Sequence, residues 1–369
     1  MSFSFGFTND DLDIDQSISN NSQNNQINPN TSFVNPLDAP ELKHNDVIQP
    51  QIESLESILA SLKDVRVSYE SIDIPTMSQS IEQPKLYRRD LFDMKHQLMS
   101  EDDSITTQQG NPNELDILIH EDLRKNIYEG GLKSWECSID LVSLLNESFY
   151  STKDLSFNEM NCIVEIGCGT ALPSEFIFQQ YLKQGTTTGL NMILTDYNSS
   201  ALRLATIPNL IITWINTSLN EEQIHSTQPE NISMKYDQEI MFSEKLLQLF
   251  INDMNLKNIN IQLISGSWGR DFTNLLHDLL KTVTNCNKLL VLTSETIYQP
   301  DHLPLISETL IDLKQNTNFN HVNQMIAAKD IYFGVGGSLI EFENYLRNRQ
   351  IVFSTKKVNA GLKRSIVIV

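Results

Sequence analysis

Carboxylates and glycines stand together where apolar runs of the sequence end. In "CIVEIGCGT" (162–170), Glu165 precedes Gly167 and Gly169, and glycines let a backbone turn tightly and approach a ligand closely. Leu172 occupies the place of the third glycine of a dinucleotide fingerprint, and a carboxylate at this point would repel a pyrophosphate. S-adenosylmethionine (SAM), which carries a sulfonium and an ammonium, fits better. The alternative is that Glu165 caps neighbouring backbone N–H groups.

A second acid ends the next apolar run. Asp196 in "ILTDYN" is placed to accept the ribose hydroxyls of a nucleoside. The alternative is an N-cap for a helix that begins at Asn198 or Ser199. Further along, Trp268 in "SGSWG" offers a flat apolar face that suits either an adenine or the core.

A third polar group follows the run "VLTSETIYQP". A turn there could direct the side chains of Glu295 and Tyr298 into the opening of the same binding site. The alternative for Glu295 is a pair with a surface lysine or arginine.

Alternating strands and helices position these groups. The predicted strands are 162–166, 192–196, 261–265, 289–294 and 323–328, with terminal strands near 350–358 and 364–369. The predicted helices between and after them are 173–182, 198–206, 271–283, 303–314 and 339–348. Short β-rich runs joined by helices predict an α/β fold with a mostly parallel sheet and helices on both faces. Ligands bind outside the carboxyl ends of such strands, where the polar groups above would meet.

The rest of the chain divides into a tail and an extension. Residues 1–48, rich in Asn, Gln, Ser and Asp, are predicted to be disordered. The segment 49–114 is predicted to be a helical extension, because "QIESLESILASLKDVRVSYES" and "LYRRDLFDMKHQLM" carry apolar residues at helical spacing. The catalytic domain would span 115–369, interrupted by a polar insertion at 216–258.

Composition narrows the classes of function. The net charge of −20 and the pI of about 4.7 argue against a general nucleic-acid binder and suit a basic protein partner; the alternative is that the surplus carboxylates serve only solubility. The sequence indicates neither a membrane span nor a signal peptide, so we expect a cytoplasmic protein, with the nucleus as a second compartment. The cysteines lack CxxC spacing and are expected to be reduced thiols rather than metal ligands: Cys137, Cys162, Cys168 and Cys286.

Several long motifs agree in order and spacing with one family. "VEIGCGT", "TDYN", "SGSWG", "SETIYQPD", the upstream "EDLRKNIYEGGLKSWECSIDLVSLL" and the downstream "AAKDIYFGVGGSLIEFE" resemble the protein-histidine methyltransferases. The resemblance implies a Rossmann-like class I methyltransferase core of seven strands that binds SAM. The cofactor contacts it implies are Ser134, Trp135, Glu136, Cys137, Glu165, Gly167, Gly169, Asp196, Tyr197, Asn198, Gly266, Ser267, Trp268 and Ser294.

The same resemblance implies the reaction. Glu295 and Tyr298 match an acidic-x-x-aromatic motif of related lysine-modifying enzymes and become the expected catalytic residues. The implied substrate is a histidine of a large-subunit ribosomal protein, methylated on the ring nitrogen farther from the backbone by a monomeric enzyme. We hypothesise that Glu295 accepts a hydrogen bond from the other ring nitrogen. A lysine methyltransferase of the same fold and a noncatalytic SAM-binding escort of a basic ribosomal protein are the alternatives, and a nicotinamide oxidoreductase is a distant third.

Overall fold

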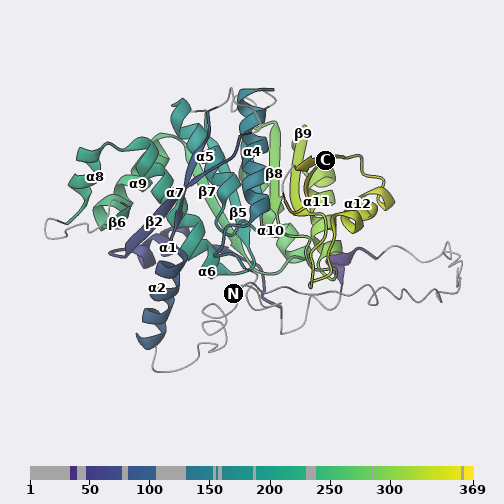
Figure 1. Ribbon diagram of the computed structural model, residues 1–369, viewed down its shortest axis with the longest axis horizontal. Coiled ribbons are helices and arrows are strands. Elements are labelled where there is room, and N and C mark those ends of the chain that lie inside the picture. Colours follow the sequence, from purple (N-terminus) through teal and green to yellow (C-terminus); the bar gives the residue numbers. More distant parts are fainter. Residues whose placement is uncertain are drawn as a thin grey trace, which may run out of the picture. The chain divides into compact units, whose positions relative to one another are not determined.

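An eight-stranded sheet forms the centre of the computed structural model (Figure 1). The structure describes residues 34–39, 47–76, 82–104, 130–152, 155–156, 160–185, 188–229, 238–284, 286–358 and 361–369. The strand order is β1-β7-β5-β4-β8-β9-β11-β10. The strands are β1 (Gln51–Glu53), β4 (Met160–Ile166), β5 (Leu190–Asp196), β7 (Ile259–Ser265), β8 (Lys288–Ser294), β9 (His321–Lys329), β10 (Ser354–Val358) and β11 (Arg364–Ile368).

Seven of these strands make the predicted core. β7, β5, β4, β8 and β9 are parallel, and β11 lies antiparallel between β9 and β10. β1 adds an antiparallel strand at the edge, beside β7. The chain moves from β4 to β5 on one side and returns to β8 on the other, so the order reverses at β4. This switch point is where open α/β sheets bind ligands.

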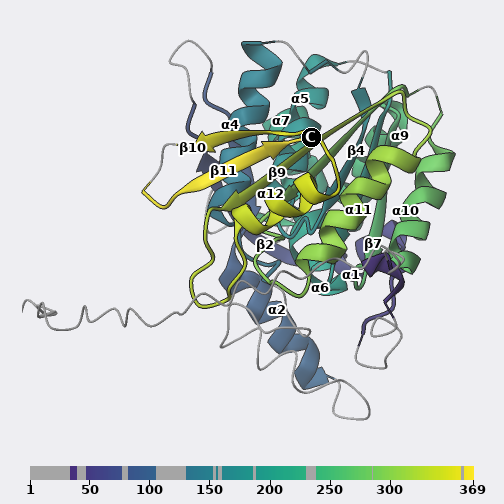
Figure 2. The same ribbon diagram turned by 90° about the vertical axis from the view of Figure 1, so that its right-hand side faces the viewer.

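Helices cover both faces of the sheet, as Figure 2 shows. Ile163 of β4 joins the core beneath α4 (Glu136–Tyr150), α5 (Leu172–Gln184) and α7 (Ile207–Ser218). Its neighbour Val164 joins the core beneath α10 (Arg270–Thr282), α11 (Leu303–Asn316) and α12 (Leu339–Asn348). Because successive side chains of a strand point to opposite faces, the unbroken apolar run of β4 supplies both cores. The predicted α/β fold is confirmed.

The extension 49–114 is not purely helical, which corrects the prediction. Its described part contains β1, α1 (Leu55–Leu62), β2 (Arg66–Asp73), β3 (Lys85–Arg89) and α2 (Leu91–Ser104). In β2, Val67 and Tyr69 are buried and alternate with less buried neighbours, a period of two that belongs to a strand. The helical stripe ends at Leu62, and the predicted boundary at 114 lies outside the described residues.

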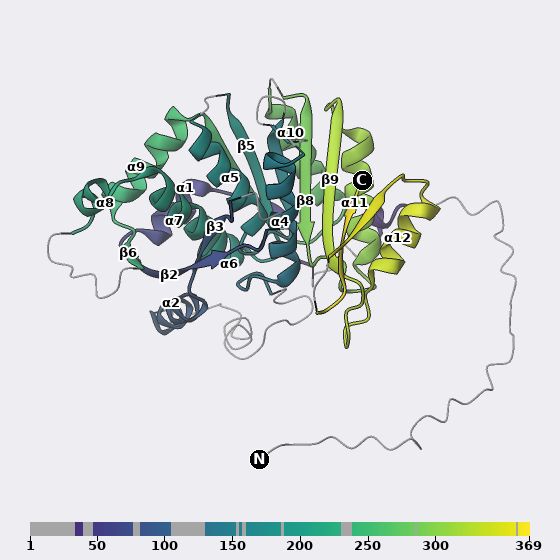
Figure 3. The ribbon, with the colours of Figure 1, turned by 45° about the horizontal axis from the view of Figure 1, so that its top comes forward.

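The insertion 216–258 contains regular structure as well. After α7 ends at Ser218, the chain forms α8 (Glu221–Thr227), β6 (Glu239–Met241) and α9 (Glu244–Leu256). β6 pairs with β2, so the insertion and the N-terminal extension complete one three-stranded sheet (Figure 3). α9 packs onto α7, where the rings of Trp214 and Phe250 meet edge to face at 5.3 Å.

Part of the tail predicted to be disordered has a defined place. Residues Pro36–Asp38 form a short 3₁₀ turn, η2, in which Leu37 is 1% exposed, whereas residues 1–33 and 40–46 lie outside the described chain. The prediction failed at η2 because a single buried leucine leaves no periodic pattern. None of the described helices is long and apolar enough to cross a membrane.

Candidate active site

A cavity of about 1380 Å³ opens at the carboxyl ends of β4, β5, β8 and β9. Its wall contains many of the residues predicted from the sequence, namely Trp135, Gly167, Gly169, Asp196, Tyr197, Ser267, Trp268, Ser294, Glu295 and Tyr298. The other predicted residues do not line the cavity: Ser134, Glu136, Cys137, Glu165, Asn198 and Gly266. The switch point of the sheet therefore carries a site large enough for a nucleoside and a substrate side chain together.

The glycine loop after β4 is packed too closely for side chains. Gly167 and Gly169 have φ of +65° and +50°, a region that L-residues with a Cβ rarely adopt. A Cβ on Gly169 would lie 2.9 Å from the carbonyl oxygen of Gly131, and one on Gly167 would lie 2.7 Å from Cγ2 of Thr296. The loop thus presents bare backbone to the cavity. Gly131 also lines the cavity, and sequence reasoning missed it.

Glu165 is fully buried behind this loop. Its Oε2 accepts a hydrogen bond from the backbone N–H of Ser174, 3.0 Å away in the first turn of α5. Its Oε1 has no hydrogen-bond partner among the described residues. Burial raises the pKa of Glu165 to about 8, against the lowering effect of the bonds from Ser174. Capping, the alternative considered for this residue, is thus what the structure shows, and one oxygen remains unused.

Asp196 joins the loops that follow β4 and β5. Its Oδ2 accepts from the N–H of Gly169 at 2.8 Å, and its Oδ1 accepts from the N–H of Asn198 at 3.0 Å. Asn198 is itself the N-cap residue of the short helix α6 (Ser199–Ala201). Burial raises the pKa of Asp196 to about 6, although these backbone bonds favour the charged form. The carboxylate lines the cavity and organises its turn at the same time.

The "SWEC" segment closes one wall of the site. Trp135 Nε1 donates to the carbonyl oxygen of Gly130 at 3.1 Å, and its ring lines the cavity. The hydroxyl of Ser134 lies 3.0 Å from that of Thr170, next to the glycine loop. Glu136 and Cys137 begin α4 and do not line the cavity. Glu136 is exposed, whereas Cys137 is buried.

Glu295 stands at the centre of a polar cluster. It has a φ of +57°, and its N–H donates to the carbonyl oxygen of Ala327 in β9. Lys329 Nζ lies 3.6 Å from Glu295 Oε1, an ion pair longer than a hydrogen bond. Burial raises the pKa of Cys137 and of Tyr332, and the charge of Glu295 raises both further. The thiol and the phenol therefore stay neutral beside the carboxylate.

Sequence reasoning missed Lys329, although it ends β9 at the carboxyl edge of the sheet. The alternative considered for Glu295 was a pair with a lysine or arginine at the surface. The partner is indeed a lysine, but it lies in the cavity wall. Lys329 lines the cavity and its side chain is only 19% exposed. A lysine at a strand end is usually solvated, so nothing local marked this one.

The mouth of the cavity is largely apolar. Tyr298 packs against Tyr332 with ring centroids 6.2 Å apart, and Trp268 meets His302 edge to face at 6.4 Å. The "FGVGG" segment turns at this mouth, where the N–H of Gly337 donates to the carbonyl oxygen of Tyr298. The exposed apolar residues of the rim are Ile331, Phe333, Val335 and Leu362.

The N-terminal segment supplies the opposite wall through Pro36, Ala39 and Val47. The N–H of Ser267 donates to the carbonyl oxygen of Ile48 at 2.9 Å. A Cβ on Gly266 would lie 2.5 Å from Cα of Pro50. The lack of a side chain at Gly266 therefore lets the N-terminal segment pack against the backbone there, and Gly266 itself does not line the cavity.

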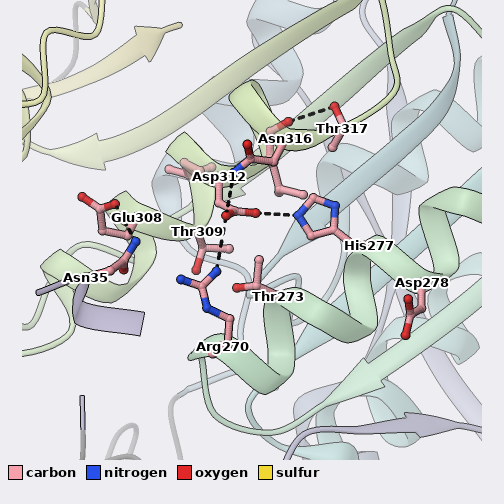
Figure 4. Close-up of polar contacts among 12 residues, drawn as sticks. Asn35, Arg270, Thr273, His277, Asp278, Glu308, Thr309, Asp312, Asn316 and Thr317 are labelled. Carbon is pink, nitrogen blue, oxygen red and sulfur yellow. Dashed lines mark hydrogen bonds and ion pairs between the residues drawn. The ribbon is translucent and has the colours of Figure 1, made fainter. Parts of the chain in front are cut away.

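A chain of charges holds this segment to α10 and α11. Arg270 donates to both carboxylate oxygens of Asp38, at 2.9 and 3.0 Å. Arg270 also pairs with Asp312, which lies 2.5 Å from Nε2 of His277 (Figure 4). Neither the segment nor its anchor followed from the sequence pattern.

The strand order, the glycine loop after the first central strand and the acid after the next one define a class I methyltransferase. Among the described residues no group of three or more His, Cys, Asp and Glu side chains could hold a metal ion.

Comparison with known proteins identifies the family. Histidine protein methyltransferase 1 of Saccharomyces cerevisiae is 48% identical over 386 aligned residues, covering 100% of this chain and 98% of its own. The protein of the same name in Schizosaccharomyces pombe is 35% identical, covering 76% of this chain and 75% of its own. The chain therefore belongs to the histidine protein methyltransferase family and is a SAM-dependent methyltransferase.

Two further comparisons add nothing to this identification. No protein-family model matches the chain. The solved rRNA methyltransferase aviRa from Streptomyces viridochromogenes aligns with a TM-score of 0.37 and 11% identity, covering 65% of this chain and 88% of its own. That likeness is too low to support an argument about this site.

Proposed function

We propose that the enzyme transfers a methyl group from SAM to the distal (tele) ring nitrogen of a histidine in a large-subunit ribosomal protein. The relationship to Histidine protein methyltransferase 1 over the whole chain supports histidine as the acceptor. The observation that carries the proposal is the single cavity in which the glycine loop and Asp196 face Glu295 and Tyr298. Cofactor and acceptor would meet there.

The described residues fit SAM. The bare backbone of Gly167 and Gly169, the carboxylate of Asp196 and the indole of Trp268 line one continuous wall. Burial makes the charged forms of Glu165 and Asp196 costly, as their raised pKa values show. A cationic ligand in the cavity would favour those charged forms. The cavity exceeds the range of about 300–1,000 Å³ typical of ligand sites, which leaves room for a substrate side chain.

Positioning is the main catalytic device of these residues. When bound, SAM supplies a methyl group activated by its sulfonium. A neutral imidazole, with a reference pKa of about 6.5, is already a nucleophile and needs no base. Holding its nitrogen about 3 Å from the methyl carbon can contribute roughly 7–11 kcal/mol.

Glu295 would select the ring nitrogen. If the proximal N–H of the imidazole donates to Glu295, the distal nitrogen keeps its lone pair and faces the methyl group. A bond forms from that nitrogen to the methyl carbon as the bond from carbon to sulfur breaks. The ring then carries the positive charge, which the Glu295 carboxylate stabilises until the proximal proton leaves to solvent. Tyr298, at the same mouth, would confine the ring.

The charge of the chain supports a ribosomal substrate, in addition to the family resemblance. The chain has a net charge of −20, which suits a basic partner because complementary charge speeds association and favours the correct pairing. Ribosomal proteins are basic because they bind RNA.

The test is methyl transfer to hypomethylated large-subunit ribosomal proteins. The purified chain and methyl-labelled SAM are incubated with these proteins, and the modified residue is located by mass spectrometry. We expect label on a histidine of one protein, and a large loss of turnover with Glu295→Gln. Label on lysine would support a lysine methyltransferase instead, and SAM binding without transfer would support a noncatalytic escort.

A further inference from the structure

We propose that Lys329 determines which acceptor the site takes: by pairing with Glu295 at the cavity wall, it excludes a cationic lysine side chain and admits a neutral imidazole. The inference rests on the proposed function and adds a specificity-determining residue to it.

Lys329 is surrounded by groups that hold a cation. Its Nζ lies 3.1 Å from Oε2 of Glu136 and 3.6 Å from Oε1 of Glu295. The same atom lies 5.4 Å from the centroid of the Trp135 indole and 6.0 Å from that of the Tyr332 ring, within the range of cation–π attraction. Two carboxylates and two aromatic faces therefore fix the ammonium beside the carboxylate that we assign to the substrate ring.

The positive charge is maintained. Burial by itself would lower the pKa of Lys329, but Glu295 and Glu136 raise it, and the net shift is upward. Burial raises the pKa of Glu136, while its own backbone bond and Lys329 lower it, with a net shift downward. Cys137 and Tyr332 stay neutral, as described above. The cluster thus holds one fixed ammonium between two carboxylates.

This arrangement discriminates between acceptors by charge. A substrate lysine that approached Glu295 would bring a second ammonium close to Lys329, and like charges at short range disfavour each other strongly. It would also have to lose a proton, with a reference pKa of about 10.4, to a carboxylate already paired with a cation. A neutral imidazole brings no charge and can donate its N–H to Glu295 beside the ion pair. Specificity here comes from a repulsive element.

Removing the charge of Lys329 would weaken this preference. Glu295 would become a carboxylate at a largely buried wall with no cation paired to it among the described residues, and such a group attracts an ammonium. Lys329→Met keeps the length and apolar body of the side chain. Lys357→Met is a matched control. Lys357 lies on β10, which β11 separates from β9; its Nζ pairs with Asp330 at 3.0 Å, and its side chain is 65% exposed.

The experiment compares two peptides that differ only in His or Lys at the target position. We measure kcat/KM for both with the wild type, Lys329→Met, Lys329→Arg and Lys357→Met, together with the affinity for S-adenosylhomocysteine. In Lys329→Met we expect the ratio of His to Lys turnover to fall by about tenfold or more, the equivalent of about one pKa unit of charge interaction, with unchanged cofactor affinity. Lys329→Arg should restore the preference, and Lys357→Met should keep it.

A second variant keeps the inference testable if Lys329→Met does not fold. Lys329→Gln removes the same charge but keeps a polar end, so the His-to-Lys ratio should fall in this variant as it does in Lys329→Met. An unchanged His-to-Lys ratio in either variant, with normal cofactor binding, would overturn the inference alone. A wild type that methylates neither peptide nor any ribosomal protein would overturn the proposed function as well.

Discussion

Asp196 holds the cofactor end of the cavity through backbone bonds. Because its carboxylate fixes the N–H groups of Gly169 and Asn198, its loss would disorder two loops and remove the acceptor for the ribose. Hydrogen bonds to a charged group contribute roughly 1.5–3 kcal/mol. We therefore expect Asp196→Ala to weaken SAM binding about tenfold to a hundredfold, as measured by calorimetry. Asp278→Ala, a change at an exposed carboxylate of α10, is the control, and equal affinities in both variants would contradict the assignment.

Cofactor binding should depend on pH through the same buried carboxylates. Without ligand, burial raises the pKa of Asp196 to about 6 and that of Glu165 to about 8, so both acids are partly protonated near neutrality. A cationic ligand favours the charged forms and lowers both pKa values, so binding releases protons and affinity rises with pH from about 5 to 8. Calorimetry in buffers of different ionisation enthalpy measures the release. Adenosine, which lacks the cationic groups and offers only its ribose hydroxyls to Asp196, should release fewer protons than SAM. A SAM affinity that falls with pH would contradict this role.

Site residues could be predicted from the sequence where their role depends on local pattern, and not where it depends on a contact with a residue far away in the chain. Glu295 and Asp196 were found because each stands directly after an apolar run. Lys329 and Gly131 were not found, because their roles depend on contacts with Glu295 and Gly169, which lie more than thirty residues away in the sequence. Local pattern shows that a side chain lies at a strand end, but not which neighbour it meets there.

The five parallel strands of the sheet were predicted to within two residues at each end, whereas β1 was missed and the strand predicted near 350–358 begins at Ser354. The strand expected at 289–294 is Lys288–Ser294, and the one expected at 192–196 is Leu190–Asp196. Buried parallel strands are continuous apolar runs and give a clear signal. The segment 51–71 was mistaken for one helix because α1 is short and β2 alternates only over Val67 and Tyr69. Pairing with β3 and β6, far away in sequence, decides the structure of β2.

The N-terminal segment should contribute to cofactor binding as an element. Asp38→Ala removes the double hydrogen bond to Arg270 that anchors η2 beside the cavity wall. The pair is partly exposed, and such pairs contribute about 0.2–1 kcal/mol, so the dissociation constant for S-adenosylhomocysteine should rise by about two- to fivefold. Lys63→Ala breaks an exposed ion pair away from the cavity and serves as the control. An unchanged constant in Asp38→Ala would show that the segment plays no part in binding.

Net charge acts at the scale of the whole molecule. Because the chain has a net charge of −20, long-range attraction should speed its association with a basic substrate. Salt screens this attraction, with a Debye length of about 10 Å at 0.1 M. We expect KM for an intact ribosomal protein to rise with salt while kcat stays constant. A short neutral peptide containing the same histidine is the control and should show little change. A KM for the ribosomal protein that does not respond to salt would remove electrostatics from substrate capture.

The account depends on one cavity that presents an activated methyl group to an uncharged aromatic nitrogen. The most direct test hydrolyses the labelled product to amino acids and separates the two methylhistidine isomers from the methyllysines. We predict that the label elutes with the isomer methylated on the distal nitrogen, and that Glu295→Gln sharply reduces it. Label that elutes with the proximal isomer or with a methyllysine would contradict the role assigned to Glu295.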